Sequence, residues 1–306
     1  MEFLRFLESI RTPAVSAFLA AITFLGDETL FMVLAIMIFW CVSKRQGYYV
    51  FAVGLGGTVV NQWLKLIFRI PRPWVVDPHF TIVESARAGA TGYSFPSGHT
   101  QTAVGTFGCI AMANRKTWLR VLCAVIVVLV PFSRMYLGVH TPLDVLVGAG
   151  CAAVLVLGLW PAFRDEDRFR RTGTFVLLGL LALSLCYAVW VNVTAFPADA
   201  DAENLAHGVK NGWTLLGCSL GLLLTRWCDG KYTRFDERAP FLGQVCKLAL
   251  GLALLLGIRA GLKPALRAIT GGAAWADAVR YFAMVVFAGC LWPRTFPFFA
   301  RLGKKK

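Results

Sequence analysis

Three short segments of this chain carry the polar residues that could do chemistry. The first is KLIFRIPRP at residues 65–73, the second is PSGH at 96–99, and the third is SRMYLGVHTPLD at 133–144. In chain order, their candidate site residues are Lys65, Arg72, Ser97, Gly98, His99, Arg134, His140 and Asp144. The set contains two histidines, one carboxylate and three cations.

Such a set of side chains suits phosphoryl transfer. Arginine forks, a lysine charge and helix N–H groups can hold the oxygens of a phosphoryl group through the transition state. One histidine can attack phosphorus while a carboxylate fixes its tautomer, and the second histidine can protonate the leaving oxygen. No Cys or His pair has metal-ligand spacing, so we expect neither a metal nor a cofactor.

Each segment also has a purely structural interpretation. Lys65, Arg69 and Arg72 are typical of cations that flank a membrane helix. Ser97 fits the N-cap of a helix, and an N-cap there directs the free N–H groups of Gly98 and the next residue toward an anion. The structural and the chemical interpretation are therefore compatible in the second segment.

The third segment also fits a helix start. Thr141 has the place of an N-cap, Pro142 is the first helical residue, and Asp144 stands where a capping-box acid belongs. Capping explains neither His140, four residues before Asp144, nor Arg134 on the same boundary. The combination of residues therefore favours a reactive site.

Composition indicates an integral membrane protein. Hydrophobic residues make up 57% of the 306 residues and charged residues 16%, and the mean hydropathy is +0.63. Soluble domains average about 25% charged residues. Most of the nine cysteines lie in apolar blocks, where they are expected to be small buried residues. We expect no cleaved signal peptide at the N-terminus.

Ten apolar blocks are candidate membrane spans. They lie at about 12–25, 29–43, 48–67, 98–113, 121–137, 143–162, 172–195, 212–225, 241–258 and 273–292. The net charge is +14, and the basic residues lie mainly in the connections between these blocks. Membrane orientation therefore explains the positive charge better than nucleic-acid binding does.

The positive-inside rule sets the predicted orientation. With both termini in the cytoplasm, the inside segments hold 20 of the 31 Lys and Arg residues, among them Arg5, Arg11 and the C-terminal 304–306 lysines. All three motif segments then lie together on the outer face. Several blocks are shorter than about 20 residues, and the loss of one span would invert everything after it.

The pattern Lys-x6-Arg-Pro, Pro-Ser-Gly-His and Ser-Arg-x5-His-x3-Asp resembles the type 2 phosphatidic acid phosphatase (PAP2) superfamily. That superfamily includes lipid phosphate phosphatases, undecaprenyl-diphosphate phosphatases, glucose-6-phosphatases and soluble vanadium haloperoxidases. The resemblance implies an all-α, polytopic transmembrane bundle with a six-helix catalytic core at residues 1–163. We expect about four additional transmembrane helices in residues 164–306, whose role the sequence leaves open.

The resemblance also implies a role for each residue. His140 is the expected nucleophile, oriented by Asp144, and His99 is the expected general acid. The phosphoryl oxygens are expected to be held by Lys65, Arg72, Ser97, Gly98 and Arg134. The family pattern implies no metal ion.

The expected substrate is a lipid phosphate or diphosphate at the surface of the membrane, with undecaprenyl diphosphate favoured if the site faces outward in a bacterial plasma membrane. Phosphatidic acid, phosphatidylglycerophosphate, phosphorylated sphingoid lipids and a small sugar phosphate stay open. So do a lipid phosphotransferase and a transporter or binding protein built on a phosphatase core. Membrane lipids are the expected surroundings, nucleic acid is not expected as a partner, and a homodimer is an open alternative.

Overall fold

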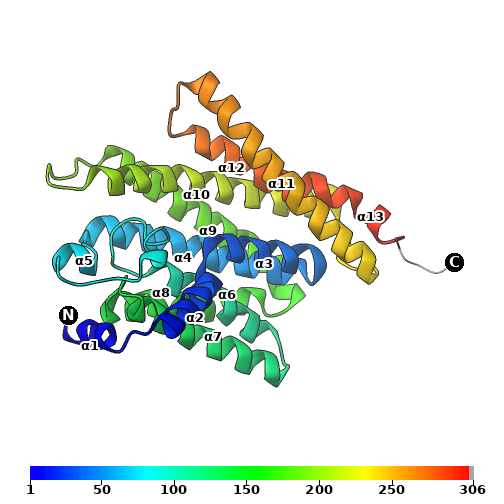
Figure 1. Cartoon of the computed structure of the whole chain (residues 1–306). Coiled ribbons are helices and arrows are strands. Elements are labelled where there is room, and N and C mark those ends of the chain that lie inside the picture. Colours follow the sequence, from blue (N-terminus) through cyan, green and yellow to red (C-terminus); the bar gives the residue numbers. More distant parts are fainter. Residues whose placement is uncertain (303–306) are drawn as a thin grey trace. The chain divides into compact units, whose positions relative to one another are not determined.

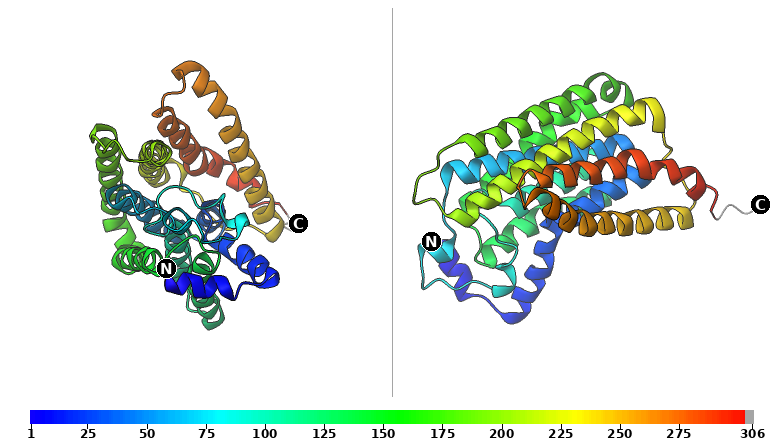
Figure 2. Two further views of the ribbon diagram at one scale, coloured as in Figure 1. Left: turned by 60° about the vertical axis from the view of Figure 1, so that its left-hand side comes forward. Right: turned by 90° about the horizontal axis from the view of Figure 1, so that it is seen from above.

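The chain is helical throughout the part that the structure describes. The computed structural model describes residues 1–302, and Figures 1 and 2 show them as helices joined by turns and loops, without a strand. The α-helices are α1 (Glu2–Ser9), α2 (Pro13–Thr23), α3 (Glu28–Cys41), α4 (Lys44–Phe68), α5 (Pro73–Val76), α6 (Gly98–Ala113), α7 (Thr117–Tyr136), α8 (Pro142–Phe163), α9 (Glu166–Val193), α10 (Ala202–Cys228), α11 (Phe241–Thr270), α12 (Ala276–Val286) and α13 (Phe296–Phe299). Short 3-10 or π turns are η1 (Phe24–Gly26), η2 (Glu84–Ala86), η3 (Asp229–Thr233), η4 (Phe287–Leu291) and η5 (Trp292–Thr295).

Six helical segments within 1–302 are long and apolar enough to cross a membrane. They are Lys44–Val76, Thr117–Tyr136, Pro142–Phe163, Glu166–Val193, Phe241–Thr270 and Ala276–Phe299. A seventh arises if the bent pair Pro13–Gly26 and Glu28–Cys41 counts as one span. These helices confirm the predicted all-α membrane bundle. The predicted spans 98–113 and 212–225 are helical, in α6 and α10, but do not meet the same criteria of length and composition.

The described chain forms two compact units. The first comprises residues 1–32, 56–161 and 195–208, and all three motif segments belong to it. Within this unit α6 packs against α7, and α7 packs against α2. The functional division predicted at residues 1–163 and 164–306 is a separate question and stays a prediction.

A small apolar core in the first unit joins its N-terminal helices to the segment that precedes His140. The buried members of this core are Leu7, Leu19, Ala86, Tyr136, Leu137 and Val139. They come from α1, α2, the long loop after α4 and the end of α7. Burial of these apolar side chains fixes the loop against the end of α7, because their removal from water is favourable.

The N-terminal segment lies beside the motif segments. Arg5 donates to the Asp77 carboxylate at 2.5 Å, and Arg11 donates to the carbonyls of Thr81 at 2.6 Å and Tyr136 at 2.8 Å. These partners lie in the loop after Arg72 and at the end of α7, so the contacts favour an N-terminus on the same membrane face as the motifs, opposite to the predicted placement.

The physical reason is the bend between the first two apolar blocks. Blocks 12–25 and 29–43 form α2, η1 and α3, with a 48° bend at the break. As one broken span, the pair takes the chain across the membrane once, whereas two separate spans take it across twice. The predicted cytoplasmic lysines at 304–306 lie outside the described residues.

The second unit comprises residues 33–55, 162–194 and 209–306. Its interior holds an aromatic group in which Trp40 and Phe296 meet edge to face with ring centroids 6.2 Å apart. Lys247 is fully buried in α11 and donates to the carbonyls of Trp40 and Glu237, both at 2.9 Å. Within this unit α11 packs against α12, and in Figure 1 α11 runs from yellow into orange while α12 is a deeper orange.

Candidate active site

The end of α4 and the following loop hold the first two candidate cations. Lys65 lies near the end of α4, is buried, and donates to the carbonyl of Tyr93. Arg72 lies just before α5 and is also buried, and it donates to the carbonyls of Thr91 at 2.7 Å and Val139 at 3.0 Å. Both side chains therefore reach loop backbone far from them in sequence.

The second segment forms the start of α6 as predicted. Ser97 is the N-cap, and its hydroxyl accepts from the backbone N–H of Thr100 at 3.4 Å. Gly98 is the first residue of the helix, and its N–H and that of His99 have no partner within the helix. Nε2 of the His99 ring lies 3.5 Å from where a Cβ on Gly89 would stand, so the ring adjoins the loop backbone at that residue.

Arg134 is a buried cation with spare donors. It lies in the last turn of α7 and is 1% exposed, and its Nη1 donates to the hydroxyl of Thr23 at 3.0 Å. Its Nε and Nη2 are buried and have no hydrogen-bond partner among residues 1–302. An unsatisfied buried donor costs about 1–3 kcal/mol, more when it is charged. The arrangement thus favours an anion that would accept both hydrogen bonds.

His140 lies between a cation and a carboxylate. Nη1 of Arg72 is 2.9 Å from Nε2 of His140, and Oδ2 of Asp144 is 3.4 Å from its Nδ1. Since a guanidinium can only donate, Nε2 accepts, and the ring proton belongs on Nδ1 facing Asp144. This tautomer leaves the Nε2 lone pair on the side of the ring away from the carboxylate.

Asp144 is held by three groups besides the histidine ring. Its Oδ2 accepts from the backbone N–H of Thr141 at 2.8 Å and from the hydroxyl of Ser94 at 2.6 Å, while its own N–H donates to the Thr141 hydroxyl at 3.3 Å. The reciprocal pair with Thr141 is the predicted capping box. The backbone carbonyl of Asp144 accepts from the N–H of Ser97 at 2.9 Å, which ties α8 to the start of α6. Capping and orientation of His140 therefore use the same carboxylate.

The surroundings keep His140 neutral. Burial is the main cause that holds the pKa of His140 well below its usual range, since it penalises the charged form. The positive charges of Arg72, Arg134 and Lys65 act in the same direction. A neutral imidazole has a free lone pair at physiological pH, which a nucleophile needs.

All eight predicted residues lie in the first unit, on the ends of α4, α6, α7 and α8 and on the loops beside them. The structure adds residues that the sequence did not single out. Ser94 holds Asp144, Thr23 holds Arg134, and the hydroxyl of Thr100 is buried without a partner in the described chain. Only the Ser94 position, just before PSGH, offered any sequence signal, because a hydroxyl beside a motif can reach its carboxylate. The predicted motif residue Ser133 turns away, since its hydroxyl donates to Val130 of its own helix at 2.7 Å.

No group of three or more His, Cys, Asp or Glu side chains within 1–302 is arranged to hold a metal ion. The positive charges around His140 are instead supplied by side chains. Arginine and lysine can neutralise phosphoryl oxygens without a bound cation.

The fold and the site define a helical membrane protein with a buried histidine, its carboxylate and a set of cations around it. Two family models match the chain: "PAP2 superfamily" over residues 45–168 and "PAP2 superfamily phosphatase, transmembrane extension" over residues 213–305. The chain belongs to the PAP2 superfamily, in a form that carries the transmembrane extension, and it is an integral membrane protein.

Relatives with curated names are lipid phosphatases. The undecaprenyl-diphosphatase BcrC of Bacillus subtilis is 32% identical over 40% of this chain and 60% of its own length. The probable sphingosine-1-phosphate phosphatase of Dictyostelium discoideum is 29% identical over 74% of this chain and 57% of its own length. The phosphatidylglycerophosphatase B of Bacillus subtilis is 28% identical over 53% and 82%. The chain thus spans only about three fifths of the first two relatives. No solved structure gives a significant match to this chain.

Proposed function

We propose that this protein is an integral membrane phosphatase that hydrolyses a lipid phosphate or diphosphate through a phosphohistidine at His140, without a metal ion. Two neighbouring features together carry the proposal. The buried Arg134 has Nε and Nη2 donors without partners in the described chain, and His140 is neutral and hydrogen-bonded to Asp144. This arrangement combines an anion receptor with a nucleophile.

In the first step, Nε2 of His140 attacks phosphorus. The N–P bond forms while the P–O bond to the leaving group breaks, and His99 gives its proton to the leaving oxygen. The ring then carries a proton on Nδ1 and phosphorus on Nε2, and Asp144 stabilises the resulting positive charge. Arg72 must transfer its Nη1 hydrogen bond from Nε2 to a phosphoryl oxygen before attack, because it occupies the lone pair at 2.9 Å.

In the second step, water attacks the phosphohistidine. His99, now neutral, takes a proton from the water as the O–P bond forms and the N–P bond breaks. Inorganic phosphate leaves and His140 returns to its neutral state. Lys65, Arg72, Arg134 and the N–H groups at the start of α6 are proposed to hold the phosphoryl oxygens in both steps.

Undecaprenyl diphosphate is the favoured substrate, at a site on the outer face of a bacterial plasma membrane. The similarity to undecaprenyl-diphosphatase BcrC supports this choice. The charge distribution along the sequence also supports an outward site. The inside segments still hold more Lys and Arg than the outside segments when Arg5 and Arg11 are counted on the outer face.

A phosphorylated sphingoid lipid is the second candidate substrate. The Dictyostelium sphingosine-1-phosphate phosphatase matches 74% of this chain, which is more than the PAP2 segment 45–168 alone. A transferase, which would pass the phosphoryl group from His140 to an alcohol, shares the first step and differs only in the acceptor.

The test is phosphate release by the purified full chain in EDTA. Substrates would be undecaprenyl diphosphate, phosphatidic acid, phosphatidylglycerophosphate, sphingosine phosphate and glucose phosphate. We expect release from one or more of the lipids and a loss of about 10³-fold or more in His140→Ala. The matched control is His79→Ala, since His79 is exposed on the loop after α5.

Four outcomes would contradict parts of the proposal. Activity that EDTA abolishes would exclude the metal-free mechanism, and activity that survives in His140→Ala would exclude the phosphohistidine. Phosphorylated alcohol in place of free phosphate, when glycerol is supplied, would identify a transferase. Binding of lipid without turnover would favour the transporter or binding protein.

A further inference from the structure

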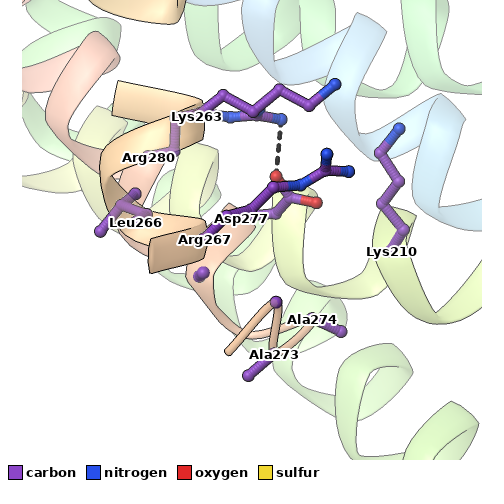
Figure 3. A pocket seen from close by; sticks show the side chains of 10 residues that line it. Lys210, Lys263, Leu266, Arg267, Ala273, Ala274, Asp277 and Arg280 are labelled. Atoms are coloured by element: carbon purple, nitrogen blue, oxygen red, sulfur yellow. Dashed lines mark ion pairs between the residues drawn. The ribbon is translucent and has the colours of Figure 1, made fainter. Parts of the chain in front are cut away.

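A second cluster of cations lies in the transmembrane extension, within the second unit. It comprises Lys210 from α10, Lys263 and Arg267 from α11, and Arg280 from α12. The four side chains line one cavity, together with a single carboxylate, Asp277. Figure 3 shows the charged ends of Lys210, Lys263 and Arg267 turned toward the same region, beside the ion pair of Asp277 and Arg280.

The only acid in the lining is already paired. Nη2 of Arg280 lies 2.6 Å from an oxygen of Asp277. Arg280 is 5% exposed, and its Nε is buried without a hydrogen-bond partner in the part of the chain that the structure describes. The cavity therefore has an excess of positive charge and a buried charged donor that an anion would satisfy.

The cavity is large enough for a phosphate group. Its volume is about 140 Å³, some ten times the roughly 10–15 Å³ that one water molecule requires. Its floor is the turn between α11 and α12, where Gly272 and small alanines leave room for a ligand. Lys263 and Arg267 are exposed at its rim.

Ordinary roles for membrane cations explain part of this cluster. Lys263 and Arg267 lie near the C-terminal end of α11, where positive charge is favourable and long side chains extend to the membrane surface. Those roles do not bring Lys210 from α10 and Arg280 from α12 to the same cavity. Like charges brought together repel one another unless an anion lies between them.

The position of the cavity indicates a ligand at the membrane surface. It lies where two candidate spans, Phe241–Thr270 and Ala276–Phe299, are joined, and such a turn stands at the level of lipid headgroups. Arginine and lysine together are the usual receptors of phosphate groups.

We propose that this cavity in the extension is a second binding site, separate from His140, for a phosphate group. Lys210, Lys263, Arg267 and Arg280 hold the phosphate oxygens, while Asp277 orients Arg280. The group comes either from a lipid headgroup or from free inorganic phosphate.

The test counts bound ligand in the full chain with His140→Ala, which removes turnover. Dodecylphosphonate, a lipid-like probe that is not hydrolysed, is titrated by calorimetry and counted by native mass spectrometry. We expect two sites per chain. In the double variant Lys263→Gln/Arg267→Gln, we expect one site to weaken at least about tenfold, since each charged hydrogen bond is worth about that factor.

Arg259→Gln is the matched control. Arg259 is exposed on the same helix, one turn before Lys263, and does not line the cavity. We expect both sites to be unchanged in this variant. The rim residues are the primary substitutions because they are exposed, and Arg280→Gln is added with its thermal stability measured.

Inorganic phosphate at constant ionic strength separates the two sources of the ligand. Affinity at least tenfold weaker than that of the phosphonate assigns the site to a lipid headgroup, and equal affinity assigns it to free phosphate. A double variant that keeps both sites overturns the proposal, as does an equal loss in Arg259→Gln. Because binding is read without turnover, the result does not depend on whether the protein is a phosphatase.

Discussion

At the scale of single residues, His140 is subject to two opposing neighbours. Asp144 favours a proton on Nδ1 and would stabilise positive charge on the ring, whereas Arg72 at 2.9 Å and the other cations oppose it. The ring is therefore neutral before substrate binds. A phosphate anion would reverse the balance, because it neutralises the cations and leaves Asp144 as the dominant neighbour.

The pH profile tests this balance. Because the pKa of His140 is lowered, its neutral form persists as pH falls below its usual range, and the acid limb of kcat/KM should lie below about 6.5. The two limbs belong to the coupled pair of His140 and His99 and not to either residue alone. The Arg134→Gln variant removes one cation, so the pKa of His140 should rise and the acid limb should move to higher pH.

The control for that shift is Arg87→Gln. Arg87 is exposed on the loop and pairs with Glu84 at 2.7 Å, so its loss should leave the acid limb in place. An acid limb that does not move in Arg134→Gln would show that this guanidinium does not act on His140. A rate independent of pH from 5 to 9, with chemistry limiting, would contradict catalysis by two histidines.

Ser94 is a positioning residue, because it acts on His140 through Asp144. Its hydroxyl donates to Oδ2 of Asp144 at 2.6 Å, and a hydrogen bond to a charged group is worth about 1.5–3 kcal/mol. In Ser94→Ala we expect kcat to fall about tenfold or more while KM stays constant, since no contact with substrate is removed. The control is Ser9→Ala, whose hydroxyl bonds only its own helix. A change confined to KM would assign Ser94 to substrate binding.

At the scale of elements, the site depends on close packing of α8 against the PSGH turn. A Cβ on Gly148 would lie 2.7 Å from the backbone carbonyl oxygen of Ser97. The same turn is tied to α8 by the bond from the Ser97 N–H to Asp144. The position of the start of α6 thus depends on glycine at position 148, one turn after Asp144, because any larger residue would displace the Ser97 carbonyl.

The prediction is that Gly148→Ala lowers both activity and stability. Displacement of a backbone group by an added methyl costs about 1–3 kcal/mol, and it would move the N–H groups proposed to hold phosphate. Gly150→Ala is the matched control on the same helix, since nothing lies within 4 Å of its Cβ. The thermal unfolding temperature and the rate of phosphate release should fall in Gly148→Ala and not in Gly150→Ala. A Gly148→Ala variant as active and as stable as Gly150→Ala would mean that α8 tolerates the methyl group.

The sequence predicted those parts of the site that lie on helix ends. Ser97 as N-cap and the Thr141–Asp144 capping box are confirmed, because capping depends on local residue types. Thr23 was not found, because a hydroxyl in an apolar helix gives no sign that Arg134 will reach it. The carbonyls of Thr91 and Tyr93 were also missed, since any residue can supply a carbonyl.

At the scale of the whole molecule, the sequence predicted the class of fold but divided the N-terminal apolar stretch into two spans where the structure has one bent pair of helices. Apolar blocks of about 14 residues are shorter than a span, so the sequence could not distinguish two spans from two halves of one. The contacts favour one broken span, because Arg5 and Arg11 bond loop residues beside the motifs. Hydropathy does not record such long-range contacts.

The last prediction is that the N-terminus lies on the same membrane face as the motif loop. Within the first unit, α6 runs from the motif end to the turn at 114–116, so that turn lies at the opposite end. Its cations, with Arg120 beyond it, place it in the cytoplasm by the positive-inside rule. In intact bacterial spheroplasts, peptide tags before Met1 and after Ala88 should both be cut by added protease, whereas a tag in the 114–116 turn should be cut only after permeabilisation. Phosphate release by each tagged protein confirms its fold. If the N-terminal tag is protected together with the 114–116 tag, α2 and α3 cross the membrane separately. If instead the 114–116 tag is cut and the other two tags are protected, the N-terminus and the motif loop still share a face, but that face is cytoplasmic.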